Sequence, residues 1–149
     1  MKKFSTKTVN ESYAVAIRIL SYREHSIFQL EQKLKKRDYT DDEILETVNA
    51  LKQENYLDNN RFSHELARQQ FNKRYGQNKI LSLLSNHHID GKITHRVMSK
   101  YSDNDFIKQA KQQLSKKNYS KNMPQKQKNK LIRHLQNRGF NLATILKAI

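Results

Sequence analysis

Six histidines are the side chains in this chain best suited to binding a metal ion, but their spacing does not favour a site. A helix brings ligands together when they lie four residues apart, and none of the histidines has a ligand partner at that distance. The adjacent His87 and His88 would point in different directions from a helix. The others are separated along the chain, at His25, His64, His95 and His134. The chain has no cysteine, which excludes thiol chemistry and a zinc–cysteine site. Together with the histidine spacing, this leads us to expect no metal site.

Acidic and nucleophilic side chains give no catalytic arrangement either. Asp41, Asp42 and Glu43 follow Thr40 directly, where carboxylates stabilise the first turn of a helix. The three glycines are isolated, so no glycine-rich loop is available to hold a phosphate. No serine, histidine and aspartate can be assigned to a triad. We therefore expect a binding protein that is not an enzyme and needs no cofactor.

The net charge of +15 is the main functional signal in the composition, and it is unevenly distributed. Met1–Tyr75 contains 14 basic and 11 acidic residues, whereas Gly76–Ile149 contains 15 basic residues and only Asp90, Asp103 and Asp105 as acids. Such a field attracts polyanions, either nucleic acid or a strongly acidic protein surface. Solubility alone would not require it, because self-repulsion of this size destabilises the compact state.

The sequence also predicts where the protein works. The start MKKFSTKTVNES has two lysines but no apolar run behind them, as a signal peptide would need, and no stretch is long enough to span a bilayer. The absence of cysteine suits a reducing compartment. We expect a cytoplasmic protein without a membrane partner.

The elements that position the charged residues are predicted to be helices, because the 149 residues include one proline, three glycines and no period-two pattern. Ser26 with Gln29, and Thr40 with Glu43, form capping boxes at helix starts, and Asp58 and Asp103 are expected to cap two further helices. Apolar residues at helical spacing predict the buried faces of the first, third and last helices: Tyr13, Ile17 and Leu20; Ile44, Val48 and Leu51; Leu142, Ile145 and Ile149.

One short apolar pattern occurs three times, about 50 residues apart, in LEQKLKKRDY, ILSLLSNHHI and LIRHLQNRGF. Its matched positions are Leu30, Leu34 and Tyr39; Ile80, Leu84 and Ile89; Leu131, Leu135 and Phe140. A period of this length indicates tandem helical units that bury their apolar faces against one another. We therefore predict an all-α, elongated tandem array of three three-helix units with about nine helices, at residues 10–56, 57–102 and 103–149.

The basic residues most able to contact a polyanion fall into three groups, one in each predicted unit. A helix-turn-helix reader of DNA needs a basic recognition helix, and among the third helices only the one with Lys92, Arg96 and Lys100 would serve. Charges spread along an array suit an extended partner better. The candidate partner-binding or nucleic-acid-binding residues are Lys35, Lys36, Arg37, Arg68, Lys73, Arg74, Lys79, Lys116, Lys117, Lys121, Lys126, Lys128 and Arg133.

The third unit carries the densest positive charge. Between Lys108 and Arg138 there are ten basic residues and no acidic one, and Tyr119 is available to stack on a base. We expect this unit to be the main electrostatic anchor, while the nearly neutral first unit makes protein contacts.

The segment AIRILSYREHSIFQLEQKLKKRDYTDDEILETVNALKQENYLDNNRFSHELARQQ resembles the first half of the RecX regulatory proteins, and the resemblance covers essentially the whole chain. It rests on short motifs in the family's order and spacing. The matching residues are Leu20, Ser21, Arg23, Ser26, Gln29 and Leu30; Leu57, Asp58, Arg61 and Phe62; and Arg138, Gly139 and Phe140. The chain departs from the family pattern mainly where glycines are usual, at Asn55, Arg74 and His88. These departures affect helix caps and turns rather than core positions.

The resemblance implies a protein that binds the RecA recombinase, chiefly as its filament on single-stranded DNA, and lies in the helical groove of that filament. It implies regulation, expected to be inhibition, of ATP hydrolysis, strand exchange and co-protease activity, in recombination, DNA repair and the SOS response. Duplex DNA is a further candidate partner, and we expect a monomer. The alternative is a basic helical nucleic-acid-binding module that acts without RecA, and a third reading is an adaptor for another acidic protein.

Overall fold

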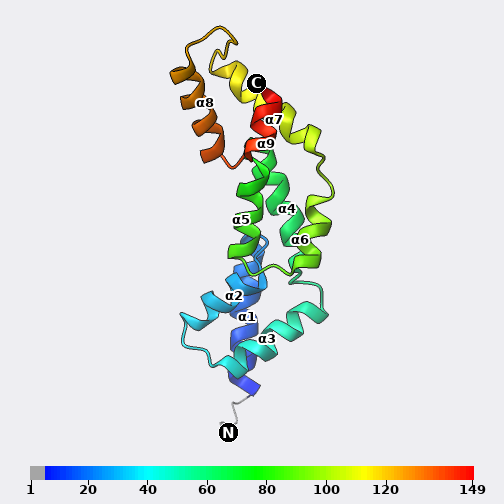
Figure 1. The fold of residues 1–149 in the computed structure, drawn as a ribbon. Coiled ribbons are helices and arrows are strands. Elements are labelled where there is room, and N and C mark those ends of the chain that lie inside the picture. The colour runs from blue at the N-terminus through cyan, green and yellow to red at the C-terminus, as the bar shows by residue number, and fades with distance from the viewer. Residues whose placement is uncertain (1–5) are drawn as a thin grey trace. The chain divides into compact units, whose positions relative to one another are not determined.

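The computed structural model describes residues 6–149, with side chains from Asn10 onward, and this part of the chain consists of helices joined by turns and short links (Figure 1). The all-α prediction is therefore confirmed. The described residues form nine helices and no strand: α1 (Thr6–Tyr22), α2 (Ile27–Lys35), α3 (Asp41–Gln53), α4 (Asn59–Asn72), α5 (Gln77–Asn86), α6 (Gly91–Met98), α7 (Asp103–Lys116), α8 (Gln125–Asn137) and α9 (Leu142–Ala148). The division into three repeats at 10–56, 57–102 and 103–149 stays a prediction.

Side-chain caps set most of the helix starts, although two of the predicted caps differ in detail. Thr40 and Glu43 form the expected capping box at α3, and Ser26 caps α2 by accepting from the Gln29 amide. At α2 the Gln29 side chain does not bond back to the Ser26 amide, as a complete capping box requires, because it accepts from Arg23 instead. Asp103 does not cap α7. It is the first helical residue, and the cap is Ser102, which forms a reciprocal box with Asp105.

Contacts divide the chain into two compact units, the first of which runs to Ser63 and includes His87–Ile89. In this unit α1 and α2 pack on α3, around a core of Ala16, Ile19, Leu30, Leu34, Ile44, Val48, Leu51 and Leu57. The inner face of α1 was predicted one residue out of register. Tyr13, Ile17 and Leu20 are only partly buried, while the fully buried Ser12 hydrogen-bonds Thr47 of α3.

The second compact unit contains His64–Asn86 and Asp90–Ile149. Here α9 packs mainly on α7, and α8 contacts both. The buried apolar residues are Ala67, Ile80, Leu84, Val97, Phe106, Ala110, Leu114, Leu135, Phe140 and Ile145. The rings of Phe71, Tyr101 and Phe106 form a cluster with centroids 4.9 to 5.9 Å apart. Leu142 was expected inside but is 49% exposed, because the buried face of α9 is formed by Ile145 and Thr144.

The recurring apolar pattern has a common backbone geometry. Its helices α2, α5 and α8 are each followed by a residue with positive φ, namely Asp38 (66°), His88 (54°) and Gly139 (96°). This conformation turns the chain so that the next residue packs back on the helix. At the end of α8 the Phe140 amide donates to the Leu135 carbonyl at 3.1 Å, and Phe140 is 1% exposed. The pattern therefore encodes a helix together with its closing turn.

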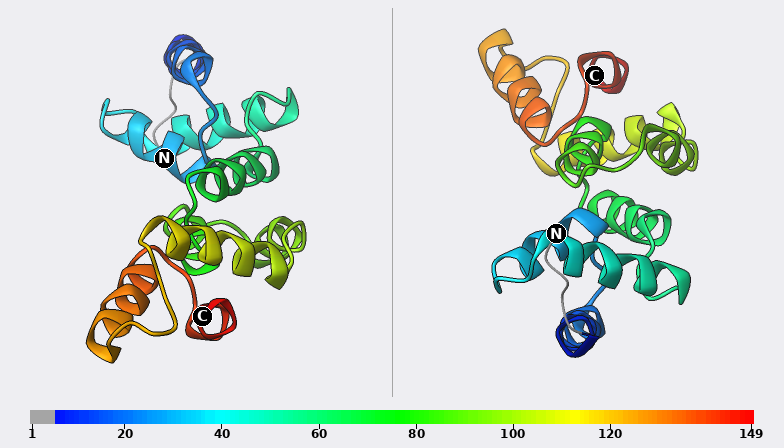
Figure 2. Two further views of the ribbon diagram at one scale, coloured as in Figure 1. Left: turned by 90° about the horizontal axis from the view of Figure 1, so that it is seen from above. Right: turned by 90° about the horizontal axis from the view of Figure 1, so that it is seen from below.

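The lysine-rich link between α7 and α8 runs beside α8 to reach its far end, as Figure 2 shows from two directions. Pro124 is the N-cap residue of α8, one position before the first helical turn. In the part of the chain that the structure describes, no helix is long and apolar enough to cross a membrane. The basic start Met1–Ser5, on which the signal-peptide argument partly rests, lies outside the described residues.

Candidate polyanion-binding surfaces

The first predicted basic group lies where α2 ends. Lys35, Lys36 and Arg37 are all exposed there, and cations are favourable beside the C-terminal end of a helix dipole. Lys35 forms an ion pair with Asp41, whose carboxylate lies 3.7 Å from the Lys35 ammonium. Because both of these side chains are largely exposed, the pair contributes little stability. Lys36 and Arg37 form no ion pair within the described residues.

Lys36 and Arg37 instead line a hollow of about 570 Å³ in the first compact unit. Its other lining residues are Ile19, Tyr22, Arg23, His25 and Lys33, so four cations and no carboxylate surround it. Tyr22 is 83% exposed, which leaves its ring available for stacking. The sequence indicated a basic patch on this unit, but a hollow between α1 and α2 depends on how the helices fold together.

His25, which is 1% exposed, positions one of these cations. Its Nε2 lies 2.8 Å from the Lys33 ammonium and its Nδ1 lies 2.9 Å from the Arg23 carbonyl. The ammonium can only donate, so Nε2 accepts and Nδ1 carries the proton that it donates to the carbonyl. Burial lowers the pKa of His25, and the positive charges of Arg23 and Lys33 act in the same direction. A neutral His25 thus holds Lys33 in place.

The second predicted group is only partly available to a ligand. Arg68 is bonded to Glu65 of the same helix, with Nε 2.9 Å from the carboxylate, so its charge is offset. Arg74 donates to the side chains of Gln109 and Gln112 on α7. Lys73 is exposed, and Lys79 lies half-buried with its ammonium 5.6 Å from the centre of the Tyr75 ring.

Arg138, which is not among the candidate residues predicted from the sequence, joins this second group. Its guanidinium lies 4.5 Å from the centre of the Tyr75 ring and donates to the Lys73 carbonyl at 2.7 Å. Tyr75 is thus flanked by two cations and is not a free stacking surface. The motif Arg138, Gly139 and Phe140 was noted only as a family feature. Its contact with the α4–α5 turn depends on the tertiary fold.

Two glycine turns, far apart along the chain, hold this group together through backbone contacts. The Gly76 amide donates to the Arg138 carbonyl at 2.9 Å, and the Asn78 amide donates to the Gly139 carbonyl at 2.8 Å. Beside them, the Gln77 side chain donates to Thr144 on α9 at 2.8 Å. A Cβ on Gly76 would lie 2.3 Å from the Phe140 nitrogen, so only glycine fits. We call this contact the double-turn junction.

The third predicted group follows the end of α7, the link and the outer face of α8. Lys116, Lys117, Lys121, Lys126 and Arg133 are exposed and Lys128 is half-buried. None of them forms an ion pair within the described residues. This part of the chain therefore carries the least compensated charge, as the sequence indicated. Which of the thirteen selected residues bind a partner stays a prediction.

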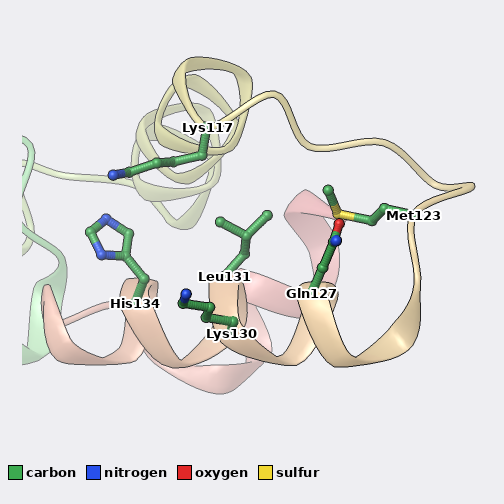
Figure 3. A pocket seen from close by; sticks show the side chains of 6 residues that line it. All are labelled: Lys117, Met123, Gln127, Lys130, Leu131 and His134. Carbon is green, nitrogen blue, oxygen red and sulfur yellow. The ribbon is translucent and has the colours of Figure 1, made fainter.

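A second hollow, of about 350 Å³, lies between α7, the link and α8 (Figure 3). Lys117, Met123, Gln127, Lys130, Leu131 and His134 line it. Burial lowers the pKa of His134, and the charges of Lys117 and Arg138 add to this effect. Lys130 belongs to the basic run but is not one of the predicted binding residues, and the sequence gives no partner for His134. Their i, i+4 spacing was the available signal that they share a helix face.

The described residues contain no group of three or more His, Cys, Asp or Glu side chains that could hold a metal ion. Asp41, Asp42 and Glu43 lie in the first turn of α3, as predicted. What the two hollows and the exposed lysines offer chemically is the binding of anions.

Comparison with known families gives matches to two models. The one described as RecX, first three-helix domain, matches residues 13–51, and the one described as RecX, third three-helix domain, matches residues 100–149. The matched regions contain the first and third copies of the recurring pattern.

Several relatives named Regulatory protein RecX are similar over most of their length. The protein from Vibrio parahaemolyticus is 30% identical over 139 residues, which cover 93% of this chain and 89% of the relative. The protein from Acinetobacter baylyi is 31% identical over 138 residues, covering 91% and 84%. Among solved structures, RecX from Lactobacillus salivarius aligns with a TM-score of 0.86 at 23% identity, covering 97% of this chain and 96% of that one.

Proposed function

The chain belongs to the RecX family of regulatory proteins, and on that basis we propose that it binds the RecA recombinase as a filament on single-stranded DNA. Binding inhibits ATP hydrolysis, strand exchange and co-protease activity by the filament. The protein acts as a cytoplasmic monomer, without a cofactor or catalysis of its own. The observation that carries the proposal is the similarity to regulatory relatives over more than nine-tenths of the chain.

The charge distribution supports a partner that contains a polyanion. The lysines from Lys116 to Lys126 are exposed and lack carboxylate partners within the described residues. A nucleoprotein filament presents both phosphates and acidic protein surface, so an uncompensated field accelerates its encounter with this protein. The field raises the association rate more than it determines specificity, which must come from shaped contacts.

Direct binding to single-stranded nucleic acid is the second candidate function, and the hollow in the first compact unit favours it. Arg23 and Arg37 can each offer two donors to one phosphate, and the exposed Tyr22 can stack on a neighbouring base. This function would give the first unit a contact with nucleic acid in addition to the protein contacts expected of it. Such binding needs no recombinase.

The deciding experiment measures DNA-dependent ATP hydrolysis by RecA at increasing concentrations of this protein. We expect the rate of ATP hydrolysis to fall and then level off as the concentration of this protein rises. The fall should occur at concentrations below those that saturate bare DNA. A parallel measurement on the same single-stranded DNA without RecA gives the affinity for bare DNA. If hydrolysis is unchanged at concentrations that already saturate bare DNA, the regulatory proposal is wrong and the nucleic-acid-binding module is favoured.

A further inference from the structure

The hollow between α7 and α8 combines an apolar floor with a cationic rim. Leu131 projects from α8 towards α7, and Met123 closes the hollow from the link (Figure 3). Lys117 reaches across from the end of α7 towards the ring of His134, and Lys130 stands on the nearer side. Apolar surface and positive charge therefore meet within one small hollow.

Charge complementarity requires an anionic occupant. No carboxylate lines the hollow, and no acidic residue follows Asp105 in the chain. A free phosphate or carboxylate would satisfy the lysines but would leave the Leu131 and Met123 surface in contact with water. An occupant that uses the whole hollow carries an apolar group with negative charge beside it.

The lining favours protein over nucleic acid. Nucleic-acid sites without sequence preference place bases on aromatic rings and phosphates on arginine forks, and this hollow contains neither a tyrosine or phenylalanine ring nor an arginine. Aliphatic and thioether side chains instead accept a Leu, Met or Phe side chain, and methionine adapts its shape to the inserted group. The hollow in the first compact unit has the opposite character, with Arg23, Arg37 and Tyr22.

We propose that the α7–α8 hollow binds an acidic segment of a protein partner by taking in one large apolar side chain, while the flanking carboxylates contact Lys117 and Lys130. Protein–protein interfaces commonly have a buried apolar anchor at the centre and polar or charged residues at the rim. This deepens the proposed function by naming the chemistry of one protein contact. Its test uses no recombinase, so either proposal can fail without the other.

His134 links this binding to pH. The charged groups that lower its pKa are Lys117 from α7 and Arg138 after α8, and Lys130 shares its helix face. Lys147, the one charged residue of α9, is not among the groups that shift the pKa. A carboxylate bound between Lys117 and His134 opposes these charges and raises the pKa of the imidazole. The segment therefore binds more tightly as the pH falls from about 7.5 towards about 6.

The test measures fluorescence anisotropy of dye-labelled peptides with the full-length protein. The probe is the capped peptide EEFEE, compared with EEAEE, which lacks the anchor, with QQFQQ, which lacks the charge, and with a thymidine pentanucleotide. We expect EEFEE to bind about tenfold more tightly than EEAEE, because burying a phenylalanine side chain is worth roughly that factor. QQFQQ and the pentanucleotide are expected to bind more weakly than EEFEE.

Variants with a matched control identify the hollow. Lys117→Gln and Lys130→Gln are each expected to weaken EEFEE binding about threefold. Lys147→Gln, which removes an exposed lysine of α9 outside the hollow and outside the candidate binding residues, is expected to leave it nearly unchanged. Met123→Ala in the link reduces the preference for EEFEE over EEAEE, and His134→Gln removes the pH dependence. Circular dichroism and melting confirm that each variant folds.

Three results would overturn the proposal. Equal binding of EEFEE and EEAEE means that no side chain enters the hollow. Equal weakening by Lys147→Gln and Lys130→Gln means that only the diffuse field is measured. Tighter binding of the pentanucleotide, with the same dependence on Lys117 and Lys130, assigns the hollow to nucleic acid instead.

Discussion

Gly76 and Gly139, both in the second compact unit, leave no room for a larger residue. At Gly139 the φ of 96° is unfavourable for any side chain, and a Cβ would lie 2.5 Å from the Cβ of Lys79. At Gly76 the obstacle is backbone, since Phe140 and Gly139 atoms occupy the space. Neither clash can be relieved by rotating a flexible side chain. Both residues thus keep the double-turn junction closed.

We predict that Gly76→Ala and Gly139→Ala each lower the free energy of unfolding by about 2 to 4 kcal/mol. Gly91→Ala is the matched control, because nothing lies within 4 Å of a Cβ there, and alanine is the better helix former at this first position of α6. It is expected to change stability by less than about 1 kcal/mol. Urea unfolding measures all three, and destabilisation at Gly91 as large as at Gly76 would contradict the clash argument.

Three histidines with lowered pKa values make stability depend on pH. Burial is the largest cause that lowers the pKa of His25, His87 and His134, and neighbouring cations lower each further. The unfolded chain therefore takes up more protons than the folded chain as the pH falls below about 6.5. Stability is complete above that pH and decreases below it.

The expected result is a melting temperature that falls between about pH 7.5 and about pH 5.5. The fall should persist in about 0.5 M salt, which screens repulsion between exposed charges but not the cost of burial. Thermal melting followed by circular dichroism at low and high salt gives the answer. A flat or rising profile in high salt would show that the histidines are not held neutral by burial.

At the scale of elements, the recurring helices α2, α5 and α8 each contribute a leucine to a core. Leu34 and Leu84 are fully buried and Leu135 is 1% exposed. We predict that Leu34→Ala, Leu84→Ala and Leu135→Ala each cost roughly 2 to 5 kcal/mol of stability. The matched control is Leu45→Ala on α3, where the side chain is 58% exposed, and we expect a cost below about 0.5 kcal/mol. Chemical denaturation distinguishes these outcomes.

Element type and most helix starts could be predicted from the sequence, because helical spacing and capping residues are local signals. The Thr40 and Glu43 box was correct for that reason. The inner face of α1 was not, since a hydroxyl pair between Ser12 and Thr47 occupies the core where an apolar residue was expected. Such a buried pair depends on a partner 35 residues away.

The departures from the family pattern also have a structural position. Asn55, Arg74 and His88 are the positions where the resemblance to the family led us to expect glycine, and all three have positive φ, between 54° and 66°. Asparagine and histidine tolerate this region better than most residues. His88 stacks on Phe28 with ring centroids 3.8 Å apart, and Arg74 donates to Gln109 at 2.9 Å. All three departures therefore keep the turn, and Arg74 and His88 add side-chain interactions that glycine could not make.

For the molecule as a whole, the excess of charge is the property that could be predicted best. The groups that the sequence proposed were partly rearranged, because ion pairs remove Arg68 and Lys35 from the available charge. Both hollows were missed, since each is formed by residues from separate elements whose packing no local pattern specifies. The net charge follows directly from the sequence, but the positions of the two hollows depend on the packing of the helices.

We predict that replacing Lys116, Lys117, Lys121 and Lys126 by Gln weakens binding to the RecA filament and flattens its salt dependence. Removing one lysine–phosphate interaction lowers the slope of log affinity against log salt by roughly 0.7 for single strands. The control replaces the exposed Lys52, Lys92, Lys100 and Lys147, with the same change in net charge. Equal effects of the two variants would mean that only the overall positive charge of the protein contributes to binding. If the first variant has no effect, the main electrostatic contact must instead involve Lys36, Arg37 and Lys73.

The double-turn junction also sets an order of events during synthesis. The turn at Gly76 leaves the ribosome well before its hydrogen-bonding partners at Arg138 and Gly139, more than a third of the chain later, have been made. Until then the Gly76 and Asn78 amides have only water as a partner, and the Tyr75 ring lacks the Arg138 guanidinium. The local helices can form early, but closing this long loop must wait for the later segment. The second compact unit is therefore completed only after the segment around Arg138 and Gly139 has been made, however quickly its individual helices appear.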